Sequence, residues 1–372
     1  MCFILDKEKM FELIDKKLEN LPSYVQKFIE YKQADDRFKA NTILSYLYDY
    51  ERFFGWLVSE GYFQGEMKDI PLSVLEELRR DDITNYQNFL KRYTEIEKRT
   101  SRNRIISSLK SLFNHLSQIA EDDNGDPLLK RNVMARVETQ NAKKSPRQQA
   151  ELLKGRVFTS NKEIHAFLDF VQNGYEQSVR NSSEREPVKK RLLHYYHLNR
   201  ERDLALMSLI LGSGLRINEA ISLDLTDIDM LERGVLVERK GKEGKTLVHF
   251  SERAKYDLEE YLAIREKRYP TGNKEKAVFL SLSTGNRIIE RITKRAAQEL
   301  VLKYTTWYGK PMSAHNLRHS FATAHWRENR DLFGLQSQLG HMDPKTTQVY
   351  ALILDDTLRE EIDNMDRSLF RE

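Results

Sequence analysis

Apolar residues recur at helical spacing in two long stretches of the first half of the chain. In each stretch the apolar positions follow one another at steps of four and three, which gathers them on one face of a helix. The first stripe consists of Ile43, Leu47, Tyr50, Phe54 and Leu57, and the second of Ile105, Leu109, Leu112, Leu116 and Ile119. Together they predict a small all-helical domain over residues 20–140, whose core is formed by the apolar stripes.

The second half of the chain mixes helical and strand patterns. Helices are predicted over residues 203–211, 288–304, 317–327 and 358–369. Two β-rich runs, residues 234–239 and 246–250, flank a polar turn and predict a hairpin, and residues 277–282 predict a further strand. The predicted fold class is therefore mainly α with two domains, the second of which contains a small antiparallel β-sheet.

A polar segment separates the two patterns. Residues 139–155 lose the apolar periodicity and gain charge and Pro146, which is typical of an exposed connection. We therefore predict a helical domain over residues 1–145, a linker over 146–156 and a second domain over 157–372.

The composition excludes several classes of protein. Apolar residues make up 40% of the 372 and charged residues 32%, and no apolar run approaches the ~20 residues that span a bilayer. The single cysteine, Cys2, excludes an internal disulfide framework and a cysteine-based zinc or iron–sulfur site. No signal peptide is recognisable at the start, so we expect a cytoplasmic protein without a membrane partner.

The charge is segregated along the chain, although the net charge is only +4. Residues 91–110 contain seven lysines and arginines against two acidic residues, residues 130–156 contain eight against two, and residues 351–372 are acidic. Local basic fields attract a polyanion such as DNA, whereas a single basic run is more often a solvated surface. Three residues on the polar face of the second helix are the candidates for DNA contacts: Arg102, Arg104 and Lys110.

Side chains suited to phosphate chemistry occur in a defined order in the second half of the chain. They are Arg216, Lys240, the His-x-x-Arg pair His315 and Arg318, then His341 and, nine residues later, Tyr350. Any one of these residues alone would indicate no function, and a lone tyrosine is more often an ordinary buried aromatic residue than a nucleophile. The ordered set carries the functional hypothesis.

Two further residues near this set have competing interpretations. His315 and His319 lie four residues apart and could ligate zinc, but no third ligand accompanies them and Arg318 between them would repel a dication. We therefore favour packing or a core hydrogen bond for His319. Glu219 is about equally interpreted as a partner that orients an arginine and as an ordinary surface glutamate.

The ordered set resembles the tyrosine recombinase (phage integrase) family, of Xer type, and the resemblance covers nearly the whole chain. It implies an N-terminal helical core-binding domain of SAM-like fold and a C-terminal tyrosine recombinase catalytic domain. Carried over by motif, the implied catalytic residues are Arg216, Lys240, His315, Arg318, His341 and Tyr350. The hairpin reads Lys-Gly-Lys-Glu-Gly-Lys, longer than the usual family pattern, so Lys242 competes with Lys240 for the role of general acid.

The resemblance implies that DNA is cut and rejoined through a 3′-phosphotyrosine intermediate. A tyrosine has an ordinary pKa of ~10, so it attacks at neutral pH only where cations and a base favour its phenolate. Arginine forks match the phosphate oxygens in the transition state, and a lysine can protonate the departing 5′-oxygen. Neither a metal nor ATP is required in that mechanism, so no cofactor is expected.

The resemblance also implies partners and a cellular role. The expected partners are double-stranded DNA with a dif-like site, a homotetramer on paired sites and a septal DNA translocase, and the role is chromosome dimer resolution at cell division. The tail contains an apolar stripe of Leu358, Ile362, Met365 and Leu369. This stripe would either dock on a neighbouring subunit, as the resemblance implies, or close the catalytic core.

Three other functions compete with that role. The first is the integrase of a mobile element, although residues 1–20 are too short for the arm-binding domain that many integrases add. The second is a type IB topoisomerase, which uses a similar residue set to relax supercoils. The third is a non-catalytic DNA-binding regulator on the same scaffold.

Overall fold

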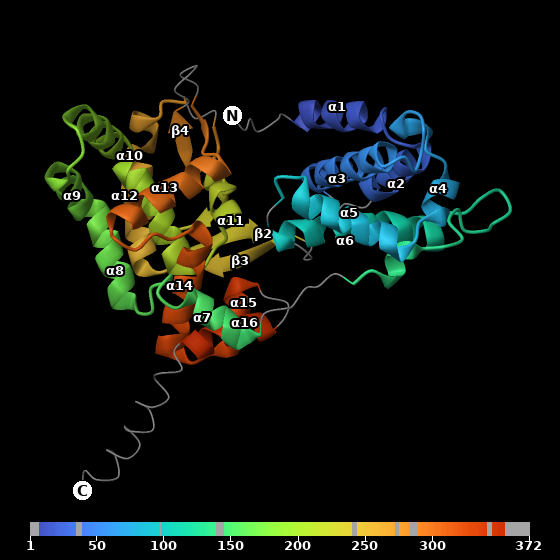
Figure 1. Cartoon of the computed structure of the whole chain (residues 1–372). Coiled ribbons are helices and arrows are strands. Elements are labelled where there is room, and N and C mark those ends of the chain that lie inside the picture. Colours follow the sequence, from blue (N-terminus) through green and yellow to red (C-terminus); the bar gives the residue numbers. More distant parts are fainter. Residues whose placement is uncertain are drawn as a thin grey trace, which may run out of the picture. The chain divides into compact units, whose positions relative to one another are not determined.

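The chain folds into two compact units, which meet in sequence between Lys143 and Lys144 (Figure 1). The computed structural model describes residues 7–34, 39–96, 98–138, 145–239, 244–271, 275–282, 289–340 and 344–353. Each unit has a hydrophobic core of its own. Within the described ranges, no helix combines the length and the apolar character that a membrane span requires.

The N-terminal unit is helical, as predicted. The two predicted helices are α3 and α6, which pack against each other, and α2 packs on both. Ile119 is an exception, because it follows the last turn of α6 and is 52% exposed. The helices of this unit are α1 (Lys7–Leu18), α2 (Ser23–Gln33), α3 (Ala40–Ser59), α4 (Leu72–Glu77), α5 (Arg80–Arg92) and α6 (Arg99–Gln118), with short 3-10 turns η1 (Met67–Asp69) and η2 (Val133–Arg136).

A buried carboxylate joins α3 to α6. Asp49 is completely buried and accepts hydrogen bonds from both terminal nitrogens of Arg104, each at 2.7 Å, and from Ser108 Oγ at 2.9 Å. Since an unpaired buried charge is costly, this bidentate pair is part of the helix packing. Arg104, predicted as a DNA contact, is therefore engaged inside its own unit.

The C-terminal unit is mainly helical with small antiparallel sheets, which confirms the predicted fold class. Strands β1, β2 and β3 form one sheet in that order, and the β2–β3 pair is the predicted hairpin, with Leu236 opposite Leu247. Strands β4 and β5 form a second sheet. The strands are β1 (Ile228–Asp229), β2 (Gly234–Glu238), β3 (Lys245–His249), β4 (Leu280–Leu282) and β5 (Ile289–Arg291).

Helices make up most of the C-terminal unit. The predicted helices at residues 203–211 and 317–327 are parts of α10 and α14, and the one predicted at 358–369 lies outside the described residues. The helices are α7 (Pro146–Leu153), α8 (Asn161–Asp169), the π-helical turn η3 (Phe170–Gly174), α9 (Tyr175–Asn181), α10 (Glu186–Ser213), α11 (Ile217–Ile221), the 3-10 turn η4 (Leu225–Asp227), α12 (Glu252–Arg268), α13 (Lys294–Trp307), α14 (Ala314–Asn329), α15 (Leu332–Leu339) and α16 (Pro344–Ile353).

One predicted helix begins later than expected. Residues 289–291 form strand β5 rather than the first turn of a helix, and α13 starts only at Lys294. The side chain of Thr293 accepts a hydrogen bond from the backbone N–H of Ala296 and so caps the helix there. The helical prediction over 288–304 is wrong for the strand residues, because pairing with β4 outweighs the local apolar spacing.

The segment predicted as a linker is largely helical. Ser145 caps α7 through its hydroxyl, and Pro146 occupies the first turn, where a missing N–H costs nothing. Helix α7 packs against α16 and buries Ala150 in that contact (Figure 1). The linker prediction for residues 146–156 is therefore wrong over the eight residues of α7, which belong to the C-terminal unit.

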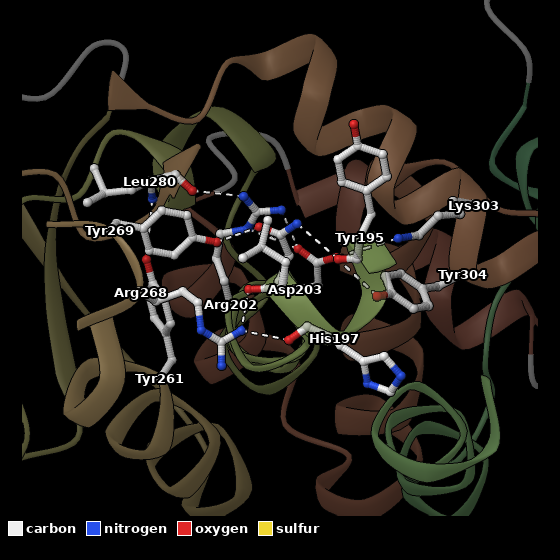
Figure 2. A network of polar contacts seen from close by, with 12 residues as sticks. Tyr195, His197, Arg202, Asp203, Tyr261, Arg268, Tyr269, Leu280, Lys303 and Tyr304 are labelled. Atoms are coloured by element: carbon white, nitrogen blue, oxygen red, sulfur yellow. Dashed lines mark hydrogen bonds and ion pairs between the residues drawn. The ribbon is translucent and has the colours of Figure 1, made fainter. Parts of the chain in front are cut away.

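A buried polar network anchors α10 to β4 and α13 (Figure 2). Arg202 Nη1 donates to the carbonyl of Leu280 at 2.9 Å, and its Nε and Nη2 donate to Asp203 at 3.0 and 2.6 Å. Asp203 also accepts from the Tyr304 hydroxyl at 3.1 Å, and Lys303 Nζ lies 3.6 Å from it. Burial and the nearby carboxylate hold the pKa of Tyr304 well above its ordinary value. The network thereby anchors α10, the long helix that ends at the Gly214 turn.

Replacing the carboxylate of this network is expected to destabilise the C-terminal unit. Asp203→Asn leaves the buried Arg202 without its counter-charge, and breaking such a pair costs about 3–5 kcal/mol. Urea unfolding followed by tryptophan fluorescence measures the loss. Asp169→Asn is the matched control, because Asp169 is 60% exposed in its pair with Arg253, and equal effects of the two changes would contradict the assignment.

Candidate active site

Arg216 begins α11 directly after the glycine turn that ends α10. Gly214 has a φ of +71°, in the left-handed region that favours glycine. A Cβ added there would lie 2.4 Å from the ring of Phe321 and 2.8 Å from Leu339. The turn thus requires glycine for its backbone angle and for space, and it presents Arg216 at a helix start, as the sequence predicted.

Glu219 lies between two of the predicted arginines. Its Oε2 accepts from the backbone N–H of Arg216 at 2.8 Å, and its Oε1 accepts from Arg216 Nη1 at 2.7 Å. Arg318 Nη1 lies 3.8 Å from the same carboxylate, whose side chain is only 8% exposed. Of the two interpretations of Glu219 that the sequence left open, the structure favours the partner that orients an arginine.

Arg318 is the buried cation of the site. Its side chain is 1% exposed, and it donates from Nη1 to the carbonyl of Gly214 at 2.6 Å and from Nη2 to that of Leu339 at 2.7 Å. Burial, and then the neighbouring Arg216, lower the pKa of Arg318 to about 10, so the guanidinium is still charged at neutral pH. Arg216 differs, because its side chain is 42% exposed.

Tyr350, on α16, faces this pair of cations and a histidine. The tyrosine is 1% exposed, and its hydroxyl lies 3.0 Å from Nδ1 of His319. Burial raises the pKa of Tyr350 to about 12, while Arg318 and Arg216 act in the opposite direction. The phenol is therefore neutral at neutral pH, in an electrostatic field that favours its anion.

His315 and His319 form one histidine pair on α14. Their ring centroids lie 4.3 Å apart in an edge-on arrangement. Burial lowers the pKa of His315, and the cations Arg318 and Arg216 lower it further. The hydrogen bond predicted for His319 exists, but its partner is the candidate nucleophile, which the sequence did not reveal.

The tyrosine helix is covered by the segment that enters the unit. Residues of α7, α14, α15 and α16, with one residue of the segment after α7, form a small separate core that includes Tyr350. Its buried members are Ala150, Val157, Ala322, Leu335, Leu339, Val349, Tyr350 and Ile353. The chain after α7 is also tied to α14, because Asn316 Nδ2 donates to the carbonyl of Arg156 at 2.9 Å and Phe158 N–H donates to Ser320 Oγ at 2.8 Å.

The structure brings together four of the six predicted catalytic residues: Arg216, His315, Arg318 and Tyr350. The others, Lys240 and His341, and the competing Lys242 lie outside the described residues. Their chain neighbours Arg239 and Gly340 are described and contact each other. Arg239, which sequence reasoning passed over, is 6% exposed, and burial lowers its pKa.

A polar cavity of about 410 Å³ lies between α5 and α6 of the N-terminal unit. Its lining is rich in side chains that can contact phosphates and base edges: Gln87, Asn88, Lys91, Arg99, Arg102 and Asn103, together with Ile106 and Glu138. Of the three predicted DNA contacts, Arg102 lines this cavity. Lys110 does not, and Arg104 is bound to Asp49.

The sequence matches known proteins over nearly its whole length. The profile described as the Phage integrase family matches residues 185–356. Over 370 residues the chain is 32% identical to a protein named Tyrosine recombinase XerS from Lactococcus lactis subsp. lactis, covering 97% of this chain and 100% of the relative. A Tyrosine recombinase XerS from Streptococcus pneumoniae gives the same identity and coverage.

The chain belongs to the tyrosine recombinase family. It is thus an enzyme that breaks and rejoins DNA, a site-specific recombinase similar to XerS. This family membership accounts for the ordered set of arginines, histidines and tyrosine from which the hypothesis began.

Solved structures share the fold of this tyrosine recombinase. The XerH site-specific recombinase bound to palindromic difH substrate superposes with a TM-score of 0.60 at 20% identity, over 98% of this chain and 90% of that chain. The Tn1549 transposon integrase in complex with transposon right end DNA gives a TM-score of 0.55 at 17% identity, over 92% and 99%.

The burial of His315 predicts a pH dependence of stability. Because the folded pKa of His315 lies below the ordinary ~6.5, the unfolded chain binds more protons in acid, and stability is lost as the pH falls through about 6.5. His315→Asn removes this contribution, so its stability should fall less than that of the wild type between pH 7.5 and 5.5. Urea unfolding at several pH values measures the difference.

The exposed His194, on α10, provides the control for this measurement. His194→Asn should retain the acid-side slope of the wild type. A wild-type slope in His315→Asn as well would show that the ring of His315 is not kept neutral by its surroundings.

Proposed function

We propose that Arg216, Lys240, His315, Arg318, His341 and Tyr350 form the catalytic set of a recombinase that works through a 3′-phosphotyrosine intermediate. The observation that carries the proposal is the position of Tyr350, whose hydroxyl lies within hydrogen-bond distance of His319 Nδ1. Burial raises the pKa of Tyr350, and the neighbouring cations Arg318 and Arg216 partly offset that rise. A nucleophilic phenol needs such surroundings, whereas a purely structural tyrosine does not.

The reaction conserves the phosphodiester energy. The Tyr350 oxygen forms a bond to phosphorus, the bond from phosphorus to the 5′-oxygen breaks, and the phenolic proton passes to a base. His319 is the base that we infer, because its Nδ1 lies within hydrogen-bond distance of the hydroxyl. The departing 5′-oxygen takes a proton from Lys240, or from its rival Lys242, and attack by the 5′-hydroxyl of the partner strand reverses the step.

The two arginines have different tasks in this proposal. Arg216 is partly exposed and uses one terminal nitrogen on Glu219, so the rest of its fork is directed to the non-bridging oxygens of an incoming phosphate. Arg318 is buried and bonded to two carbonyls, so it acts mainly through its charge. The phosphate supplies the negative charge that the cluster lacks.

We further propose that the biological reaction is the resolution of chromosome dimers at a dif-type site during cell division. The support is similarity to XerS proteins over essentially their full length, together with the fold shared with a recombinase crystallised on difH DNA. Integration of a mobile element is the second candidate, and it is favoured by the fold shared with the Tn1549 transposon integrase. The expected assembly is a homotetramer on paired sites, with a septal DNA translocase as a further partner.

The N-terminal unit is proposed to hold DNA through the cavity between α5 and α6. Lys91, Arg99 and Arg102 supply positive charge there, while the amide side chains of Gln87, Asn88 and Asn103 have the donor and acceptor pairs that read base edges. The predicted interface is therefore retained for Arg102 and extended to the residues that share its cavity.

Replacing the nucleophile tests the proposed chemistry. With a nicked suicide duplex that carries the host's dif-type site, the wild type should accumulate a covalent protein–DNA adduct, and Tyr350→Phe should give none while binding the same DNA. Denaturing gel electrophoresis detects the adduct, and an electrophoretic shift measures binding. His319→Ala should form the adduct more slowly than the wild type. Persistence of the adduct in Tyr350→Phe would overturn the proposal.

Salt dependence tests the DNA interface. Arg102→Ala and Lys91→Ala should each weaken binding and reduce the slope of log affinity against log salt by about 0.9, the value for one phosphate contact. Arg104→Ala is the contrasting variant, because it breaks the buried pair with Asp49 and should lower the unfolding midpoint of the N-terminal unit. An unchanged salt slope in both cavity variants would contradict the proposed interface.

A further inference from the structure

Arg239, at the end of β2, grips the last turn of α15. Its Nη1 donates to the carbonyl of Ser337 at 3.1 Å, and its Nη2 donates to the carbonyl of Gln338 at 2.6 Å. The last carbonyls of a helix have no partner inside the helix and carry its negative dipole end, so a guanidinium is well matched to them. Arg239 is only 6% exposed, so these hydrogen bonds are buried inside the unit and are not a surface pairing.

The turn after α15 is shaped to receive this side chain. Gly340 has a φ of +62°, and a Cβ added to it would lie 2.5 Å from Arg239 Nη1 and 2.9 Å from its Cζ. The arginine therefore lies directly against the glycine backbone, and only a residue without a side chain leaves room for it. Arg239 and Gly340 form an interlocked pair.

A second bond holds the other strand of the hairpin to the same turn. Gln338 Nε2 donates to the carbonyl of His249, at the end of β3, at 2.6 Å and to the carbonyl of Ser213 at 2.9 Å. Beside it, Leu339 accepts from the buried Arg318. The end of α15 thus joins β2, β3, the end of α10 and the catalytic arginine.

The contact of Arg239 with the end of α15 and Gly340, here called the clamp, is significant because of the residues that follow Arg239 and Gly340 in the chain. Lys240 directly follows Arg239, and His341 directly follows Gly340. Two residues of the proposed catalytic set therefore directly follow the two residues of one contact, that of Arg239 with Gly340. A general acid gains its effect only where its proton is delivered along a short and defined path.

We propose that Arg239 is a positioning residue, which locks the β2–β3 hairpin onto the end of α15 so that the lysine of the hairpin can protonate the departing 5′-oxygen. This inference rests on the proposed function, because it assigns a part of the same site. Arg239 itself touches neither DNA nor the reacting atoms in this role. The guanidinium is required rather than any cation, since two carbonyls must be bonded by one planar group.

A substrate whose leaving group needs no proton separates positioning from folding. In a 5′-bridging phosphorothiolate duplex, the Tyr350 oxygen bonds to phosphorus and the bond from phosphorus to sulfur breaks. The sulfur departs as a thiolate and needs no proton from a general acid, because a thiol has a pKa of only about 8.5. Loss of the lysine, or of its position, is then repaired by the substrate, whereas loss of fold or of the nucleophile is not.

The experiment measures adduct formation by the full chain on matched oxygen and sulfur suicide duplexes. Arg239→Ala, Arg239→Lys and Gly340→Ala should each slow cleavage of the oxygen duplex by about 10- to 100-fold, as expected for a displaced catalytic group. On the sulfur duplex each should return to within about threefold of the wild type, as Lys240→Ala or Lys242→Ala should. Arg295→Ala, an arginine paired on the surface of α13, is the matched control and should cleave both duplexes normally.

Two outcomes overturn the inference without touching the proposed function. One is that the sulfur duplex restores a lysine variant but neither Arg239 variant of the clamp, because Arg239 would then act through the fold or through the segment of His341 and not through the lysine. The other is that Arg239→Lys, which keeps the charge, cleaves the oxygen duplex at the wild-type rate. Failure of the proposed function looks different, because Tyr350→Phe would then form adduct on either duplex.

Discussion

The catalytic unit depends on the convergence of two helix ends on one buried guanidinium. Gly214 follows the last residue of α10 and Leu339 is the last residue of α15, and the carbonyls of both accept from Arg318. Helix C-termini carry partial negative charge, so a cation that is almost wholly buried is stabilised there without a full counter-ion. Glu219 adds one carboxylate at the edge of the cluster. The cluster remains poor in negative charge, and this deficit suits it to a phosphate.

The same arrangement explains why the arginines lie close together although they repel. Arg216, Arg239 and Arg318 come from three different parts of the chain, and each donates hydrogen bonds to different oxygens. The acceptors are Glu219 for Arg216, the carbonyls of Ser337 and Gln338 for Arg239, and the carbonyls of Gly214 and Leu339 for Arg318. Burial lowers the pKa values of Arg239 and Arg318, and repulsion by Arg216 lowers both further. Backbone carbonyls at helix ends hold Arg239 and Arg318 in place, and the Glu219 carboxylate holds Arg216.

Much of this architecture could be predicted from the order of the residues. The helices α3, α6 and α14 and the β2–β3 hairpin follow directly from apolar periodicity, and the ordered polar set led to the family. Contacts across long sequence separations could not be predicted in the same way. The bond from His319 to Tyr350 spans 31 residues, and the bonds from Arg239 to α15 span 98 and 99, so no local spacing reveals them. Helix α7 escaped prediction because it is short and buries little besides Ala150.

Helix α7 also bears on how this enzyme can be divided. A fragment that starts at residue 157 would lack α7, which packs against α16, and would open the small core to which Val349 and Ile353 belong. Tyr350 would then lie on a helix that has lost one of its packing partners, next to a newly exposed apolar patch. A catalytic fragment suited to separate expression should instead begin ahead of Ser145, so that the capped start of α7 is retained. The border between the two compact units of this chain thus falls before a helix and not after it.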